Sequence, residues 1–197
     1  VTATVANATR IFGVANPAFI ITYSGFVNAA TSVVLDVLPT ASTTAIISSN
    51  VGVYPINAAG GNDNNYTFNY VSGTLTITKA TPTVTWNNPA AITYGTALSA
   101  TQLNATASVP GNFVYTPTAG TVLNAGANQT LTVNFTPSDG LNYESVNGTT
   151  VQITINRATP VLTWPAPAAI TYGTVLSAIQ LNASANVAGT FVYSPAV

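Results

Sequence analysis

Acidic residues are the first candidates for a chemical site in this sequence of 197 residues. Asp63 lies within GGNDNN, and Asp139 and Glu144 stand five positions apart on either side of GLNY. Bound Ca²⁺ takes about six to eight oxygen ligands, usually from several carboxylates. Asp and Asn beside glycine are equally the residues that tight turns require. We expect turns here, with no bound metal and no cofactor; these three residues are the candidates should a cation bind.

Side chains suited to catalysis are scarce. The sequence has no histidine and no cysteine, which removes the usual general base near neutral pH and thiol chemistry. Asp139 and Glu144 could act as a pair of carboxylates, but their spacing on a turn implies no pocket around them. We therefore expect no catalytic residues and no enzymatic activity.

Two tryptophans, Trp86 and Trp164, stand at equivalent places in a repeated sequence. An exposed ring could stack on a sugar, whereas a core ring buries a large apolar area and satisfies its N–H at the end of a domain. Recurrence at a fixed position of a repeat is what packing produces, so we favour the core interpretation. Glycan stacking on these two rings is the alternative.

The charge of the chain excludes several partners. Only 4% of the residues are charged and the net charge is −1, while 47% are hydrophobic. Nucleic acids and anionic membranes attract clustered Lys and Arg, so we expect neither as a partner. No apolar run approaches the roughly 20 residues of a membrane-spanning helix, so we expect no membrane insertion. The hydrophobic content predicts a folded chain.

Repetition is the main organising feature of the sequence. Residues 80–117 align with residues 158–195, about two positions in three are identical, and AITYGT occurs in both. Repeats at a fixed spacing are typical of arrays of similar modules. We divide the chain into a first unit at 1–79, a complete repeat at 80–157, and the first half of a second repeat at 158–197, which is either truncated or completed by another chain.

The elements that position these residues are predicted to be strands. Residues 74–78, 130–136 and 151–155 alternate apolar side chains with Thr, Asn or Gln, the pattern of a half-buried strand. Gly, Pro, Asn and Asp separate such stretches. Residues 175–185 could be mistaken for a helix, but the same pattern recurs at 99–105 beside strong turn signals. The predicted class is all-β, with short strands in β-sandwiches.

Three smaller motifs have structural interpretations. Gly95 and Gly173, in the two copies of AITYGT, are predicted to adopt a backbone conformation that favours glycine. Asn65-Tyr66 and Asn142-Tyr143 are predicted to anchor turns, as tyrosines do in Greek-key sandwiches.

The junctions KATP and RATP contain proline, which restricts the backbone on both sides. We therefore expect short, stiff connections between the units.

Residues 1–80 resemble the MBG (mostly β, glycine-rich) domains of bacterial surface proteins, through ATRIFGVANPAF, ITYSGFVN, VGVYPI and NYTFNYVSGTLTITKA. Residues 80–157 and 158–197 resemble the bacterial Ig-like repeats that often follow such domains, through ATPTVTW, AITYGT, LNATA and NYESVNGTTVQITI. The resemblance implies tandem immunoglobulin-like β-sandwiches in an elongated array, located outside the cell or on its surface. It also implies that Arg10 is a buried or capping cation rather than a site.

The function expected from these features is structural. We expect a segment of an extracellular bacterial fibre or adhesin stalk, with neighbouring repeats or other copies of the chain as partners. In the filament form of this hypothesis, residues 158–197 expose strand edges that a neighbouring subunit completes by β-strand addition. The alternative is a carbohydrate-binding surface module with glycans as partners.

Overall fold

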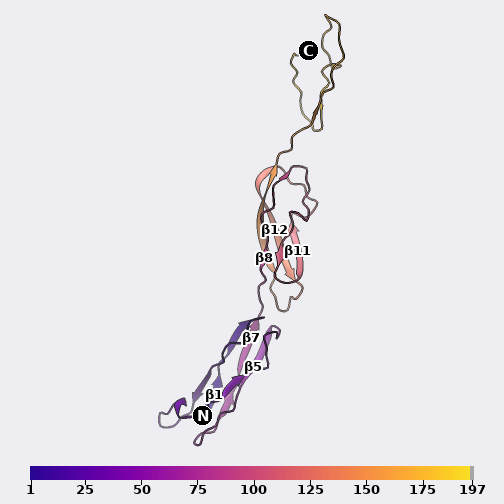
Figure 1. Ribbon diagram of the computed structural model, residues 1–197. Helices are drawn as coiled ribbons and strands as arrows, with labels where there is room; N and C mark the ends of the chain where they lie inside the picture. Colours follow the sequence, from indigo (N-terminus) through magenta and orange to yellow (C-terminus); the bar gives the residue numbers. More distant parts are fainter. Residues whose placement is uncertain (196–197) are drawn as a thin grey trace.

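The computed structural model describes residues 1–195 as a chain of β-strands arranged in an elongated molecule (Figure 1). Within this range the helical structure is one 3₁₀ turn, η1 (Ser32–Val34). The prediction of an all-β protein is confirmed. Residues 196 and 197, the end of the predicted third unit, lie outside the described residues. We refer below to residues 1–79, 80–157 and 158–195 as the first, second and third segments.

The first segment contains two sheets. Its strands are β1 (Thr2–Val5), β2 (Ala8–Ile11), β3 (Ile21–Ser24), β4 (Thr40–Ser42), β5 (Gly52–Ala59), β6 (Asn69–Val71) and β7 (Gly73–Thr78). One sheet has the order β3-β1-β6 and the other β2-β7-β5-β4. Strand β2 lies parallel to β7, and β5 lies antiparallel to it.

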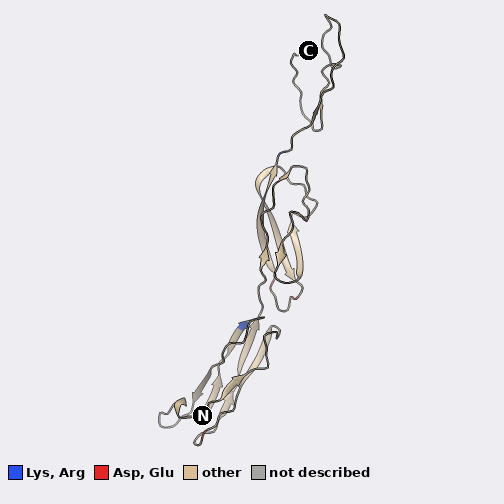
Figure 2. Cartoon of the chain, in the orientation of Figure 1, with Lys and Arg blue, Asp and Glu red and all other residues tan. Residues whose placement is uncertain are grey.

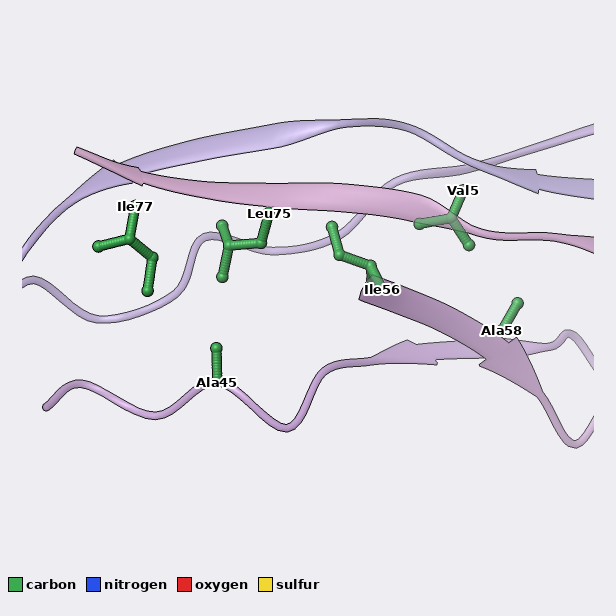
Figure 3. Packing of buried hydrophobic residues seen from close by; sticks show 6 residues of the cluster. All are labelled: Val5, Ala45, Ile56, Ala58, Leu75 and Ile77. Carbon is green, nitrogen blue, oxygen red and sulfur yellow. The ribbon is translucent and has the colours of Figure 1, made fainter. Parts of the chain in front are cut away.

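Alternation in β7 builds the core of the first segment. Leu75 and Ile77 are buried while the threonines that alternate with them are not, as the sequence pattern predicts. Figure 3 shows these two side chains beside Ile56 from β5, with Ala45 opposite them. Burial of apolar side chains of this size contributes roughly 1.5–3 kcal/mol each, before the entropy of ordering them is counted.

The second segment is built around one long hairpin. Its strands are β8 (Val84–Thr85), β9 (Ile92–Thr93), β10 (Thr106–Ala107), β11 (Gly111–Thr116), β12 (Gly126–Pro137) and β13 (Val146–Asn156). The main sheet has the order β11-β12-β13-β9, and β8 pairs with β10. Alternate residues in the second half of β12 and of β13 are buried, and the core of the segment contains Leu98, Leu131 and Ile153.

The third segment has little sheet. Strands β14 (Leu162–Thr163) and β15 (Ser184–Ala185) form one short antiparallel pair. Residues 175–185 form turns and strand β15 rather than a helix, which confirms the prediction. Large apolar side chains are exposed throughout: Val161, Leu162, Trp164, Ile170, Tyr172, Val175, Ile179, Val187, Phe191 and Val192.

The segments follow one another along the chain, but each forms its own β-sheets. Within residues 1–195, every strand pairing joins strands of the same segment. Charged residues are sparse along the chain (Figure 2). Gly95 and Gly173 have φ angles of +95° and +92°, in the left-handed region, so the prediction for the two AITYGT glycines is confirmed.

Candidate functional site: the joint between the first and second segments

A turn at residues 139–144, which we call the Asn-Tyr corner, carries the contacts between the first two segments. The carboxylate of Asp139 accepts hydrogen bonds from the backbone N–H of Asn142 at 3.2 Å and from its side-chain Nδ2 at 2.8 Å. The N–H of Tyr143 donates to the backbone carbonyl of Asp139 at 3.1 Å. Asp139 thus fixes both the backbone and the amide orientation of Asn142, an Asx-type use of the side chain.

The Asn142 amide reaches across to the first segment. Its Oδ1 accepts the backbone N–H of Val51 at 2.9 Å, and its Nδ2 lies 3.0 Å from Oδ1 of Asn50. The residue is only 5% exposed. A buried amide that lost these partners would leave polar groups unsatisfied, at a cost of roughly 1–3 kcal/mol. The contact therefore specifies one orientation of the two segments.

An aromatic pair lies beside the amide. The rings of Phe12 and Tyr143 have centroids 5.5 Å apart and planes 79° apart. This edge-to-face geometry is the one that aromatic quadrupoles favour, and it contributes about 0.5–1.5 kcal/mol beyond the buried area. The joint thus combines a directional polar contact with an apolar one.

The connecting chain is also held by the corner. Ala80 forms a parallel bridge with Tyr143: its N–H donates to the carbonyl of Asn142 at 2.9 Å, and its carbonyl accepts the N–H of Glu144 at 2.9 Å. Pro82 follows two residues later, with its φ fixed by the ring. The linker is therefore part of the folded structure at this point.

Arg10 holds the loop that presents Asn50. It is 5% exposed, and it donates to the carbonyl of Ile46 at 2.6 Å and to Oδ1 of Asn16 at 2.7 Å. Nδ2 of Asn16 in turn donates to the carbonyl of Ala45 at 2.7 Å. Arg10 is a buried cation satisfied by neutral oxygens, as the family resemblance implied.

The predicted cation candidates are placed in turns. The carboxylate of Asp63 accepts the backbone N–H groups of Asn65, Tyr66 and Asp36 at 2.8, 3.0 and 3.1 Å. These bonds, the one from Asn65 first among them, lower the pKa of Asp63. Asp139 is engaged within the Asn-Tyr corner, where Glu144 contributes its backbone. Among the described residues, no three Asp, Glu, His or Cys side chains form a group that could hold a metal ion.

The two tryptophans share one local environment. Nε1 of Trp86 donates to the carbonyl of Gln102 at 3.0 Å, and Nε1 of Trp164 to the carbonyl of Gln180 at 3.1 Å. Trp86 packs against the core of the second segment, whereas Trp164 is 52% exposed. Glycan stacking on these rings stays a prediction.

The sequence has an Asn-Tyr pair in each of the first two segments, but backbone pairing does not place Tyr66 where Tyr143 lies. The amino group of Val1 donates to the carbonyl of Thr67 at 2.7 Å, and the N–H of Asn69 to the carbonyl of Val1 at 2.9 Å. This is the pattern that Ala80 makes with Asn142 and Glu144. Phe68 rather than Tyr66 therefore occupies the place of Tyr143.

Sequence reasoning identified Asn142 and Tyr143 as turn residues but missed their role between segments. It also missed Phe12, Asn50 and Val51, which complete the contact. A signal was present: Asn50-Val51-Gly52 and Asn124-Ala125-Gly126 each lead into the strand that lies antiparallel to the last strand of their segment.

Comparison with known proteins adds one finding about the first segment. Residues 1–76 match the family described as MBG domain (YGX type). Domains of this type are typical of bacterial surface proteins. No curated protein matches the chain. A search of the described residues for a helix long and apolar enough to cross a membrane found none.

Proposed function

We propose that this chain is a structural, non-catalytic segment of an extracellular bacterial fibre or adhesin stalk. Its units are immunoglobulin-like β-sandwiches at 1–79 and 80–157, with a further one begun at 158–197. The joint at the Asn-Tyr corner carries the proposal, since it fixes one unit against the end of the next. The match of residues 1–76 to a domain type of bacterial surface proteins supports the location.

The contacts of the joint suit a spacer. Units in a linear array meet only at their ends, so the stiffness of the whole depends on each joint. Here an amide, an aromatic pair and a bridged linker act together. None of these contacts depends on an exposed ion pair, so salt has little to screen.

Strand addition is the second part of the proposal. The third segment exposes apolar side chains, and within the described residues its strand pair β14–β15 has no further strand on either outer edge. Such open edges pair readily with a further strand. Later strands of the same chain complete it in a covalent array. A neighbouring subunit completes it in a filament, by β-strand sharing.

Two measurements on native cells test the role and separate these forms. Antibodies to residues 1–79 should label intact, non-permeabilised cells, with a cytoplasmic protein of the same cells as the negative control. The mass of the extracted chains after denaturation then distinguishes a filament of short subunits from a covalent array in one long chain. Label that appears only after permeabilisation would contradict the proposal.

A carbohydrate-binding role is the second candidate, because the Trp164 ring is half exposed and Tyr172 is fully exposed. The test is Trp164 emission in a Trp86→Phe background, titrated with cell-wall and host-type glycans. Saturable quenching by a glycan, abolished in Trp164→Phe, would favour this role over the spacer. Emission unmoved by glycans would exclude the ring as a platform.

A further inference from the structure

The far end of the second segment repeats the backbone pairing of the first. Strand β9 lies parallel to β13 as β2 lies parallel to β7, with Thr93 opposite Asn156 and Ile11 opposite Thr78. The next N–H in each case, that of Tyr94 or Phe12, donates at 2.8 Å to the carbonyl of the opposite residue. Tyr94 therefore occupies the place of Phe12.

The neighbouring loop corresponds as well. Gly126 pairs with Ile155 as Gly52 pairs with Ile77. Because these pairs are equivalent, Asn124 and Ala125 occupy the places of Asn50 and Val51.

Two equivalent surfaces can thus be defined, one on each of the first two segments. The first docking surface comprises Phe12, Asn50, Val51 and Ala80. The second docking surface comprises Tyr94, Asn124, Ala125 and Ala158. Each contains one aromatic ring, one asparagine, a small or branched apolar residue after it, and the alanine of the linker.

The two surfaces differ in whether they are covered. Phe12, Val51 and Ala80 are half-buried under the Asn-Tyr corner, whereas Tyr94 is 50% exposed and Ala125 and Ala158 are exposed. A recess of about 270 Å³ lies here, lined by Tyr94, Ala125, Ala158 and Arg157. Among the described residues, the backbone of Ala158 has no hydrogen-bond partner of the kind that holds Ala80.

We infer that the second docking surface binds the Asn-Tyr corner of the repeat begun at Ala158. Later strands of the same chain, equivalent to β12 and β13, carry this corner. Its asparagine amide bonds the N–H of Ala125 and the side chain of Asn124, and its tyrosine packs edge-on against Tyr94. Its backbone brackets Ala158 as Asn142 and Glu144 bracket Ala80.

The third segment itself supports this occupant. Residues 158–195 reproduce the contacts of residues 80–117, including the Trp–Tyr pair at 5.5 Å against 5.3 Å. The turns and the short strand pair of the unit are therefore already formed, whereas the residues equivalent to β9 and β11, which pair with the hairpin in the second segment, are not strands here. A hairpin seated there brings its corner to the same end of the unit, beside Ala158.

The test extends the chain with its own sequence. Residue 197 corresponds to residue 119, so a second copy of residues 120–157 is appended after Val197. Amide exchange is measured by NMR at Ala125 and Ala158 in the extended and original chains. We expect both amides to exchange in the extended chain at about one tenth of their rate in the original chain, or more slowly. Trp164 emission should shift to the blue as its segment becomes covered.

Matched variants assign the effect to the corner. Asn142→Ala in the appended copy should restore fast exchange at Ala125 while Trp164 stays covered. Tyr143→Phe in the appended copy should leave the protection intact. A covered Trp164 with unprotected Ala125 and Ala158 would overturn the inference. Protection of these amides in the original chain that increases with protein concentration would also overturn the inference, because a second copy of the chain would then cover the surface.

A second chain covers the case in which the appended segment does not fold. Residues 1–157 followed by a complete copy of residues 80–157 contain a repeat whose strands all derive from the second segment. Fast exchange at Ala125 in this chain would also overturn the inference. The inference deepens the proposed stalk role, and rests on it only for the existence of a following repeat. The amide-exchange result does not depend on the cell-surface labelling result, so the inference and the proposed function can fail separately.

Discussion

Residues 80–117 and 158–195 form the same local contacts in different surroundings. In both, a glutamine accepts bonds from a serine three residues earlier, through Ser99 with Gln102 and Ser177 with Gln180. In both, a tyrosine hydroxyl accepts a backbone N–H ten residues before it. Short-range sequence alone specifies these contacts, since they form whether or not a core is complete.

Burial separates the two regions. Leu98 is 2% exposed, whereas the equivalent Leu176 is only half-buried, and Trp164 is more exposed than Trp86. The second segment has β12 and β13, and the described part of the third has no counterpart to them. The comparison teaches that the turns of this repeat are local, while its stability depends on two late strands.

The largest expected effect comes from truncating a core side chain that β12 and β13 cover. Leu98→Ala should destabilise the second segment by about 2–5 kcal/mol, because it leaves a cavity against β12 and β13. Leu176→Ala should cost about 1 kcal/mol or less, since its surroundings are open. Urea unfolding measures both costs. Trp86 emission in a Trp164→Phe background reports the second segment, and Trp164 emission in a Trp86→Phe background reports the third. Equal costs would mean that the third segment already has a closed core.

Removing the amide of the joint ranks second. Asn142→Ala should cost about 1–3 kcal/mol, because Val51 and Asn50 lose their partner in a partly buried contact. Asn124→Ala, at the uncovered equivalent of Asn50, is the control and should change stability by less than about 0.5 kcal/mol. Thermal unfolding monitored by circular dichroism compares them. A costly Asn124→Ala would show that this asparagine already has a structural partner.

The aromatic pair of the joint gives a smaller effect. Tyr143→Ala should lose the edge-to-face contact with Phe12, worth about 0.5–1.5 kcal/mol beyond the buried area. Tyr143→Phe keeps the ring and should behave like the unaltered chain. A double-mutant cycle with Phe12→Ala isolates the coupling between the two rings. Additive costs would mean that the rings do not interact.

The smallest effect is expected from the turn of the first segment. Backbone N–H bonds lower the pKa of Asp63 below its ordinary value of 3.8. The unfolded chain therefore takes up the proton first, so the stability from Asp63 is complete above about pH 4 and is lost as the pH falls through the lower folded pKa. Asp63→Asn should flatten this part of the stability curve between pH 5 and 2, measured by thermal melts. An unchanged slope would remove Asp63 as its source.

Much of the fold follows from sequence because its signals are local. Alternation in residues 74–78 and 151–155 predicts strands, and the repeated AITYGT predicts a glycine turn; both are found. The turn roles of Asp63 and Asp139 also follow from their Asn- and Gly-rich surroundings. These features depend on neighbours within a few residues.

The joint could not be predicted in the same way. Asn142 forms hydrogen bonds with residues about ninety positions earlier. No sequence pattern around Asn142 or around those residues indicates that they contact each other. Its partners became evident only when β-pairing aligned Asn50 with Asn124 and Phe12 with Tyr94. The shift from Tyr66 to Phe68 in the first segment likewise became evident only from backbone pairing, through the hydrogen bonds of Val1 with Thr67 and Asn69.

Residual dipolar couplings of the unaltered chain test the central claim most directly, since they report the relative orientation of the first two segments in solution. If the Asn-Tyr corner fixes the joint, one alignment tensor should fit the amides of residues 1–79 and 80–157 together. Asn142→Ala should then require two tensors. Separate tensors in the unaltered chain would contradict the account, because the segments would move independently and could not act as a stiff spacer.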